Sequence, residues 1–179
     1  MLKIIPNYLT AFRILLIPIL VLSFFMDGVV SHYVAASIFI FASITDFFDG
    51  YLARLWNAQS NFGKMLDPIA DKMLVASTLM MLVYTHRADV VPAIAILCRE
   101  ILVSGMREYL IELKVHIPVS RLGKIKTTAQ MVAIIILLLG SNVIPIPYID
   151  ILGKLMLWVA SILTIFTGYL YCKEGFKHL

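Results

Sequence analysis

The chain has 179 residues, of which 61% are hydrophobic and 15% charged, and its mean hydropathy is +0.93. A water-soluble domain of this length must expose a large share of its residues to water, so this composition excludes the soluble class and indicates an integral membrane protein. The net charge of +4 is modest, the two cysteines lack metal-ligand spacing, and no nucleic-acid partner is expected.

Six apolar stretches follow one another along the chain. A bilayer core takes roughly 20 mainly apolar helical residues to cross, and a helix is the structure that satisfies the backbone hydrogen bonds there. The second and third stretches are shorter because charged residues adjoin them, so each is expected to continue as helix into its polar end. The six predicted spans are 8–26, 33–45, 69–84, 90–109, 127–139 and 151–172.

Basic residues between the spans predict the orientation. Six spans place both termini on one side, and the segments on that side carry Lys3, Arg54, Lys64, Lys114, Arg121, Lys124, Lys126, Lys173 and Lys177. The opposite loops carry only Arg87. The positive-inside rule therefore predicts cytoplasmic termini and cytoplasmic polar segments at 46–72 and 110–126. With no internal repeat, residues 1–179 are expected to form a single membrane domain.

Four aspartates flank the connection between the second and third predicted spans. Asp46 and Asp49 are three residues apart, and Asp67 and Asp71 are four apart. On a helix either spacing places both side chains on one face, so the four carboxylates are expected to converge from adjacent helices. Carboxylates near a bilayer repel one another unless a cation neutralises them, and hard oxygen ligands favour Mg²⁺, Mn²⁺ or Ca²⁺ over zinc. The pattern predicts a divalent metal site with room for two ions.

Small residues and an arginine accompany these aspartates. Gly50, Ala53 and Gly63 leave space for a ligand against the backbone, and Arg54 adds a fixed cation suited to a phosphate. Together with the metal they favour a nucleotide diphosphate group as ligand. There is no Walker loop and no Ser–His or Cys–His arrangement for covalent catalysis. A lone aspartate at a helix end is usually a solvated cap, but two spaced pairs at membrane depth favour a functional site.

These positions resemble the signature of the CDP-alcohol phosphatidyltransferase family at eight fixed places in a 26-residue window: Asp46-x2-Asp49-Gly50-x2-Ala53-Arg54-x8-Gly63-x3-Asp67-x3-Asp71. Three further segments are similar to the bacterial branch of that family that makes phosphatidylglycerophosphate. They are IPNYLTAFR at 5–13, REILVSGMRE at 99–108 and LGKIKTTAQ at 122–130. The last predicted span carries no signature.

The resemblance implies a fold, a reaction and partners. The expected fold is all-α and integral to the bacterial cytoplasmic membrane, with six transmembrane helices, a short juxtamembrane helix before the first, and pairing as a homodimer. The expected reaction takes CDP-diacylglycerol and an alcohol to a phosphatidyl-alcohol and CMP, with the active site on the cytoplasmic side.

It also implies a role for each motif residue. Two divalent ions, Mg²⁺ or Mn²⁺, would be held by Asp46, Asp49, Asp67 and Asp71, with Asp71 also the general base. The CDP-lipid would be bound by Asn7, Thr10, Arg13, Gly50, Ala53, Arg54 and Gly63.

The acceptor alcohol depends on cations outside the signature, which are Arg99, Arg107, Arg121, Lys124 and Lys126. A cluster of this kind suits an acceptor that carries its own phosphate, and with the resemblance it favours glycerol 3-phosphate. The alternatives are that those near the fifth span only anchor the chain at the membrane surface, or that Arg99 only pairs with Glu100 or Asp67.

Two other functions stay open from the sequence. The nearer one is the same family with inositol phosphate or serine as acceptor. The more distant one is a divalent cation transporter with the aspartates along an ion path. Against the transporter, the carboxylates cluster at one membrane face and Arg54 would repel a passing cation.

Overall fold

The computed structural model describes residues 5–55, 61–113, 115 and 121–178. Within them, the side chains of residues 5–9, 47–55, 61–65, 67, 121 and 178 are not described. The described chain is helical, which confirms the all-α prediction. Its elements are α1 (Ile5–Ser23), α2 (Val29–Leu55), α3 (Asn61–Tyr84), α4 (Val90–Glu112), α5 (Arg121–Val143), α6 (Ile149–Gly175) and the 3₁₀ turn η2 (Phe176–His178).

The chain divides into two compact units. The first holds residues 1–81 and 142–145, and the second holds residues 82–141 and 146–179. The prediction that residues 1–179 form a single domain stays a prediction.

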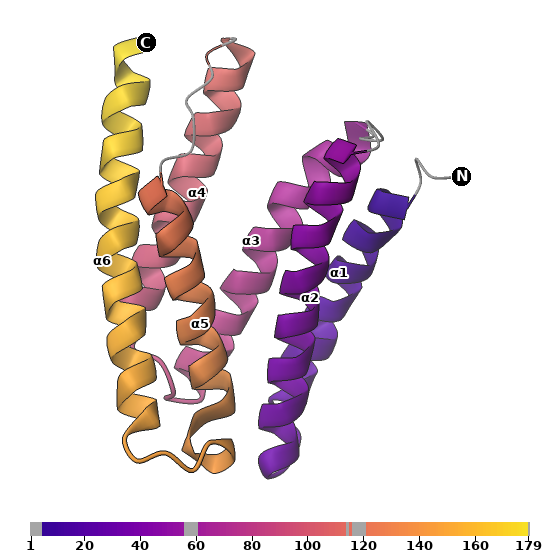
Figure 1. Cartoon of the computed structure of the whole chain (residues 1–179), viewed down its shortest axis with the longest axis vertical. Coiled ribbons are helices and arrows are strands. Elements are labelled where there is room, and N and C mark those ends of the chain that lie inside the picture. The colour runs from indigo at the N-terminus through magenta and orange to yellow at the C-terminus, as the bar shows by residue number, and fades with distance from the viewer. Residues whose placement is uncertain (1–4, 56–60, 114, 116–120, 179) are drawn as a thin grey trace. The chain divides into compact units, whose positions relative to one another are not determined.

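In the first unit α1 packs against α2 (Figure 1). Gly28, with a φ of 67°, turns the chain between the two helices, because a residue without a Cβ adopts this left-handed conformation at little cost. Phe12 of α1 meets Phe41 of α2 edge to face, with ring centroids 6.3 Å apart. Leu20 and Phe39 are fully buried, so the helices are joined mainly by apolar packing.

The second and third predicted spans do continue as helix into their polar ends. α2 runs past the predicted end at residue 45 to Leu55, and α3 begins at Asn61, before the predicted start at residue 69. Pro68 lies inside α3, where its ring replaces one backbone donor of the helix. The aspartate motif therefore lies on two long helices instead of a polar loop.

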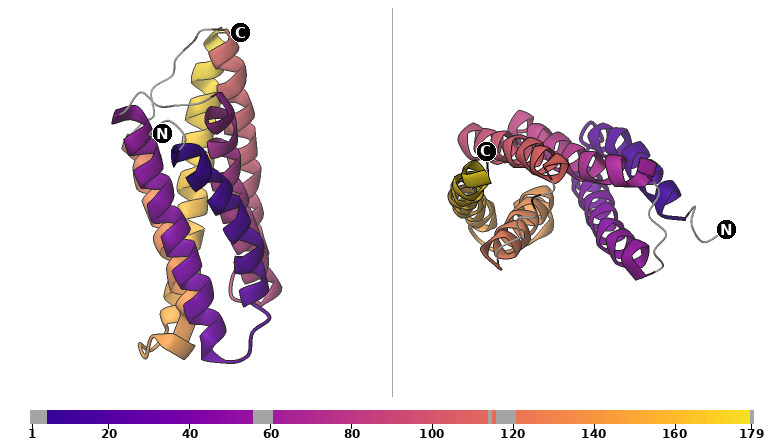
Figure 2. Two further views of the ribbon diagram at one scale, coloured as in Figure 1. Left: turned by 90° about the vertical axis from the view of Figure 1, so that its right-hand side faces the viewer. Right: turned by 90° about the horizontal axis from the view of Figure 1, so that it is seen from above.

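In the second unit α4 and α6 run side by side (Figure 2). They are parallel, since Trp158 near the start of α6 donates to Asp89 at the start of α4 (Nε1–Oδ2, 2.9 Å), while Gly175 at the other end of α6 lies near Leu110. α5 runs antiparallel to α6, because Leu137 near its end lies against Gly153 near the start of α6.

The α3–α4 loop carries Arg87, which donates to the carbonyl oxygen of Leu138 in α5 (Nη1–O, 3.4 Å). Burial lowers the pKa of this guanidinium, and the carboxylate of Asp150 opposes the shift. Arg87, the basic residue of the loops predicted to lie opposite the termini, thus contacts α5.

Large apolar side chains are exposed on all six helices, including Leu15, Phe41, Met80, Ile101, Ile125 and Ile162. A surface of this kind is stable in lipid and not in water. By length and composition, the described residues contain three helices able to cross a membrane, Val29–Asp46 within α2, Leu122–Val143 within α5 and Ile149–Gly175. A shorter apolar helix covers Thr10–Ser23.

One local expectation differs from the structure. The first predicted span reaches residue 26, whereas α1 ends at Ser23 and the backbone N–H groups of residues 24–26 bond three residues back as turns. From Ile5 onward α1 is one continuous helix, and the expected short juxtamembrane helix stays a prediction. Pro145 and Pro147 lie in the connection between α5 and α6.

Candidate active site

The aspartate motif occupies the end of α2 and the start of α3. Asp46 and Asp49 both lie in α2, and Asp67 and Asp71 both lie in α3, so the helical spacing assumed from the sequence is confirmed. The backbone of the neighbouring motif residues is helical as well. The side chains of Asn7, Asp49, Arg54 and Asp67, and the surroundings of Gly50, Ala53 and Gly63, lie outside the described residues.

Arg13 of α1 reaches across to this motif. Its side chain is fully buried, and its Nη1 lies 2.7 Å from Oδ1 of Asp46, whose side chain is 38% exposed. Thr10, one turn earlier on α1, is also buried. A buried guanidinium is stable when a carboxylate compensates it, and the same guanidinium lowers the repulsion that Asp46 exerts on other carboxylates. α1 therefore contributes a charge to the aspartate site as well as packing.

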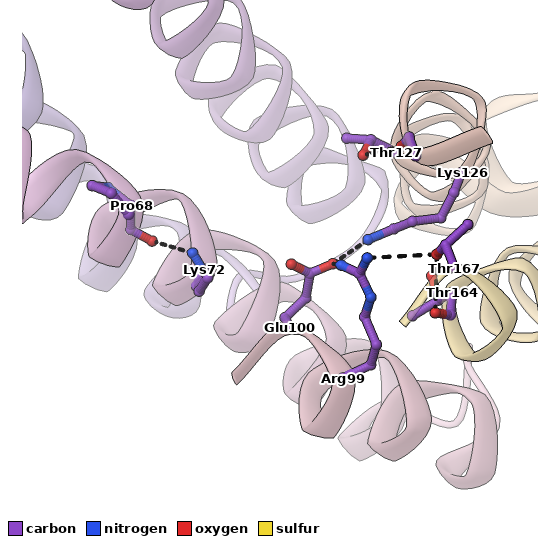
Figure 3. Close-up of polar contacts among 9 residues, drawn as sticks. Pro68, Lys72, Arg99, Glu100, Lys126, Thr127, Thr164 and Thr167 are labelled. Atoms are coloured by element: carbon purple, nitrogen blue, oxygen red, sulfur yellow. Dashed lines mark hydrogen bonds and ion pairs between the residues drawn. The ribbon is translucent and has the colours of Figure 1, made fainter. Parts of the chain in front are cut away.

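Asp71 is half-buried on α3. One position further on, Lys72 turns back along the helix, where its Nζ donates to the carbonyl oxygen of Pro68 at 2.9 Å (Figure 3). Among the described side chains, which leave out Asp49 and Asp67, no three acidic, histidine or cysteine residues come close enough to hold a metal ion.

A second polar cluster lies inside the second unit, formed by Arg99 and Glu100 of α4 with Lys126 of α5 (Figure 3). The Glu100 carboxylate accepts from Lys126 Nζ and lies 3.2 Å from Arg99 Nη1. The lysine side chain is 4% exposed and the glutamate 22%, so solvent screens this interaction weakly. Two cations and one carboxylate leave the cluster with a net positive charge, which suits an anionic ligand.

Helix α6 completes this cluster on the other side of Arg99. Arg99 Nη2 lies 3.5 Å from Thr167 Oγ1, at the long limit of a hydrogen bond. The Thr167 hydroxyl itself donates to the carbonyl oxygen of Thr164 at 3.1 Å, which leaves its lone pairs for Arg99 (Figure 3). Gly168 is adjacent to the aliphatic part of Arg99.

The other predicted acceptor cations lie elsewhere on the same helices. Arg107 follows Arg99 by eight residues, about 12 Å along α4 and about 80° around it. Its guanidinium lies 5.8 Å from the ring centroid of Tyr171. Lys124 is exposed, whereas Lys126, about 200° further around α5, is buried. The Arg121 side chain is not described.

A sequence profile described as CDP-alcohol phosphatidyltransferase matches residues 3–166, and this match includes the whole aspartate motif. The chain belongs to the CDP-alcohol phosphatidyltransferase family. Similar proteins include a CDP-diacylglycerol–glycerol-3-phosphate 3-phosphatidyltransferase of Rickettsia felis, 50% identical over 98% of this chain and 97% of that protein. Proteins of the same name from Rickettsia typhi and Escherichia coli K12 are 52% and 43% identical over 96% of this chain, covering 96% and 94% of their own lengths.

In this CDP-alcohol phosphatidyltransferase, the sequence motifs point to the predicted site residues but not to the residues that contact those side chains. The sequence predicts Glu100 only as a partner of Arg99, yet it contacts both Arg99 and Lys126. A carboxylate at membrane depth beside an arginine indicates that it pairs with more than one cation of a polar cluster. Thr167 and Gly168 had no signal, and both lie just beyond the residues that the family profile matches.

Proposed function

We propose that this chain transfers the phosphatidyl group of CDP-diacylglycerol to sn-glycerol 3-phosphate, giving phosphatidylglycerophosphate and CMP. The observation that carries the proposal is identity of 43–52% to proteins named for this one reaction, over nearly the whole of both chains. The aspartate motif on α2 and α3 lies within the residues that the family profile matches.

The proposed topology has six crossings in the bacterial cytoplasmic membrane, with both termini and the active site facing the cytoplasm. Supporting it, α4, α5 and α6 alternate in direction, as successive crossings must. The basic residues favour the same orientation, because most of them lie on the side of the termini. A short surface helix at the start of the chain and pairing as a homodimer remain part of this proposal.

The proposed metal ligands are Asp46, Asp49, Asp67 and Asp71, which would hold two divalent ions, Mg²⁺ or Mn²⁺. The donor set fits, since carboxylate oxygens at helical spacing on two helices are the hard ligands these ions prefer. Arg13 fits as well, because its ion pair with Asp46 offsets part of the negative charge that four carboxylates would bring together. Bound ions would stabilise the negative charge on the pyrophosphate and on the departing CMP.

In the proposed reaction a free hydroxyl of glycerol 3-phosphate attacks the phosphatidyl phosphorus. A new oxygen–phosphorus bond forms, the bond to the CMP oxygen breaks with its electron pair leaving on CMP, and Asp71 accepts the hydroxyl proton. Asp71 suits this role because it lies on α3 within the aspartate motif and its side chain is only partly buried. Asn7, Thr10 and Arg13 on α1, with Gly50, Ala53, Arg54 and Gly63, would hold the CDP-lipid so that its phosphorus is presented to that hydroxyl.

The proposed acceptor site uses Arg99 and Lys126 for the phosphate of glycerol 3-phosphate, with Arg107, Arg121 and Lys124 adding positive charge around them. Arg99 and Lys126 have the strongest support, because they share a carboxylate partner and are shielded from solvent. Glu100 holds the two cations near each other before a phosphate binds. A bound phosphate would compensate the positive charge that this carboxylate leaves in the cluster.

The test is CMP release by the purified chain from CDP-diacylglycerol with Mg²⁺ or Mn²⁺ and one acceptor at a time. We expect CMP with glycerol 3-phosphate and none above background with inositol phosphate or serine. Release of CMP with another acceptor but not with glycerol 3-phosphate would overturn the acceptor assignment. Flux of metal ions into liposomes without any CDP-lipid turnover would instead favour transport.

A further inference from the structure

We propose that Thr167 and Gly168 of α6 are positioning residues that set the direction of the Arg99 guanidinium and thereby the affinity for the acceptor phosphate. The inference rests on the proposed function of Arg99, and it extends the site to a helix segment that follows the family profile match.

Gly168 makes room for the Arg99 side chain. A Cβ at position 168 would lie 2.8 Å from Arg99 Cγ and 3.3 Å from Arg99 Nε, closer than such atoms approach without a shift of one of them. Cγ is near the start of the arginine side chain, so rotating only the guanidinium does not relieve the contact. An alanine here therefore forces a new Arg99 rotamer or separates α4 from α6.

Thr167 fixes the other end of the same side chain. Its hydroxyl proton is donated to the Thr164 carbonyl oxygen, so its oxygen is oriented as an acceptor toward Arg99 Nη2 at 3.5 Å. Nη1 of the same guanidinium faces Glu100. Arg99 Nε is buried and has no hydrogen-bond partner among the described residues, so close packing by Gly168, not a third bond, holds the middle of the side chain.

The chain offers a matched control on the same helix. At Gly153 an added Cβ would also lie 2.8 Å from its nearest neighbour, but that neighbour is Leu137 Cδ2. Gly168→Ala and Gly153→Ala thus introduce the same group at the same closeness, one against a charged side chain and one against an apolar side chain. A purely structural effect would be similar in both variants.

The experiment measures KM for each substrate, kcat and Tm of the full chain in detergent micelles. We expect Gly168→Ala to raise KM for glycerol 3-phosphate about tenfold, equivalent to one weakened charged hydrogen bond, with KM for CDP-diacylglycerol nearly unchanged. Thr167→Val should act in the same direction and Thr167→Ser should retain the wild-type KM. Gly153→Ala should change Tm without a selective change in KM.

Combining Gly168→Ala with Arg99→Ala separates this inference from the proposed function. Without Cγ at position 99 the new Cβ meets no arginine, so Gly168→Ala should lower Tm in the wild-type background and not in the Arg99→Ala background. If the wild type turns over glycerol 3-phosphate and Gly168→Ala leaves its KM unchanged, the positioning role is wrong. If the wild type does not use glycerol 3-phosphate, the proposed function fails. Equal Tm effects in both backgrounds would then also overturn the positioning role, whereas a coupled effect would support it.

Discussion

Lys126 pairs with Glu100, and substitutions of this pair can separate the contribution of Lys126 to stability from its contribution to phosphate binding. The two charges are shielded, with side chains 4% and 22% exposed. Removing one partner of a buried ion pair typically costs about 3–5 kcal/mol, because the other charge is left uncompensated. Since Arg99 remains near the Glu100 carboxylate, we expect the lower end of this range for Lys126→Met.

For Lys126→Met the free energy of unfolding should fall by about 3 kcal/mol, which for a chain of this size corresponds to a fall in Tm of about 6–12 °C. Lys126→Met should also raise KM for glycerol 3-phosphate by roughly 10–100-fold, the effect of one lost hydrogen bond between charged groups. In the double variant Lys126→Met with Glu100→Gln, both charges of the pair are gone. We expect KM for glycerol 3-phosphate to stay high, while Tm recovers at most in part, because Arg99 has then lost its carboxylate partner.

The assays are thermal unfolding in detergent and CMP release at varied glycerol 3-phosphate. Lys154→Met is the matched control, since Lys154 also pairs with a carboxylate, Asp89, but its side chain is 37% exposed. An exposed pair contributes about 0–1 kcal/mol, so this variant should change Tm little and KM not at all. Recovery of the wild-type KM together with Tm in the double variant would refute a binding role for Lys126.

Four further predictions concern the aspartate site and the fold. Asp71→Asn should lower kcat by at least about 100-fold, as expected for loss of a general base, while CDP-diacylglycerol binding measured by equilibrium titration is retained. Arg13→Met should lower kcat/KM for CDP-diacylglycerol roughly 10–100-fold, with partial retention in Arg13→Lys. An equal rise in KM for both substrates would contradict the role of its ion pair with Asp46. Chelation of divalent ions should abolish CMP release, and added Mg²⁺ or Mn²⁺ should restore it; unchanged release in excess chelator would exclude the metal site. Gly140→Ala should lower stability by about 1–3 kcal/mol, because a φ of 62° with a ψ of −175° in α5 suits only glycine, and an unchanged Tm would contradict this.

The helices could be predicted with good accuracy because the signal is local. Apolar runs long enough for a bilayer predict helices wherever they occur, and α2 and α3 continue into charged segments despite Gly50 and Pro68. The sequence could not place helix ends as well. The second predicted span begins at residue 33, but α2 begins at Val29 and buries His32, whose Nε2 is 3.1 Å from Asn142 Nδ2.

The sequence predicted the surroundings of the acceptor cations less well than it predicted the helices, because residues close along a chain can lie on different faces of a helix. Lys124 and Lys126 are two residues apart, yet one is exposed and the other buried. Arg107 is near Arg99 in sequence, but its guanidinium lies over the Tyr171 ring. Their proposed roles as phosphate ligands are therefore supported unequally.

The sequence by itself determined that the chain is helical, apolar enough for a membrane, and equipped with four aspartates at the spacing typical of its family. Those properties depend on composition and on residues a few positions apart. Only the tertiary structure decided which charges compensate one another. Lys126 meets Glu100 from 26 residues away, and Arg99 meets Thr167 from 68 residues away. Such pairs depend on which helices pack together and in which direction, and no local pattern along the chain encodes that.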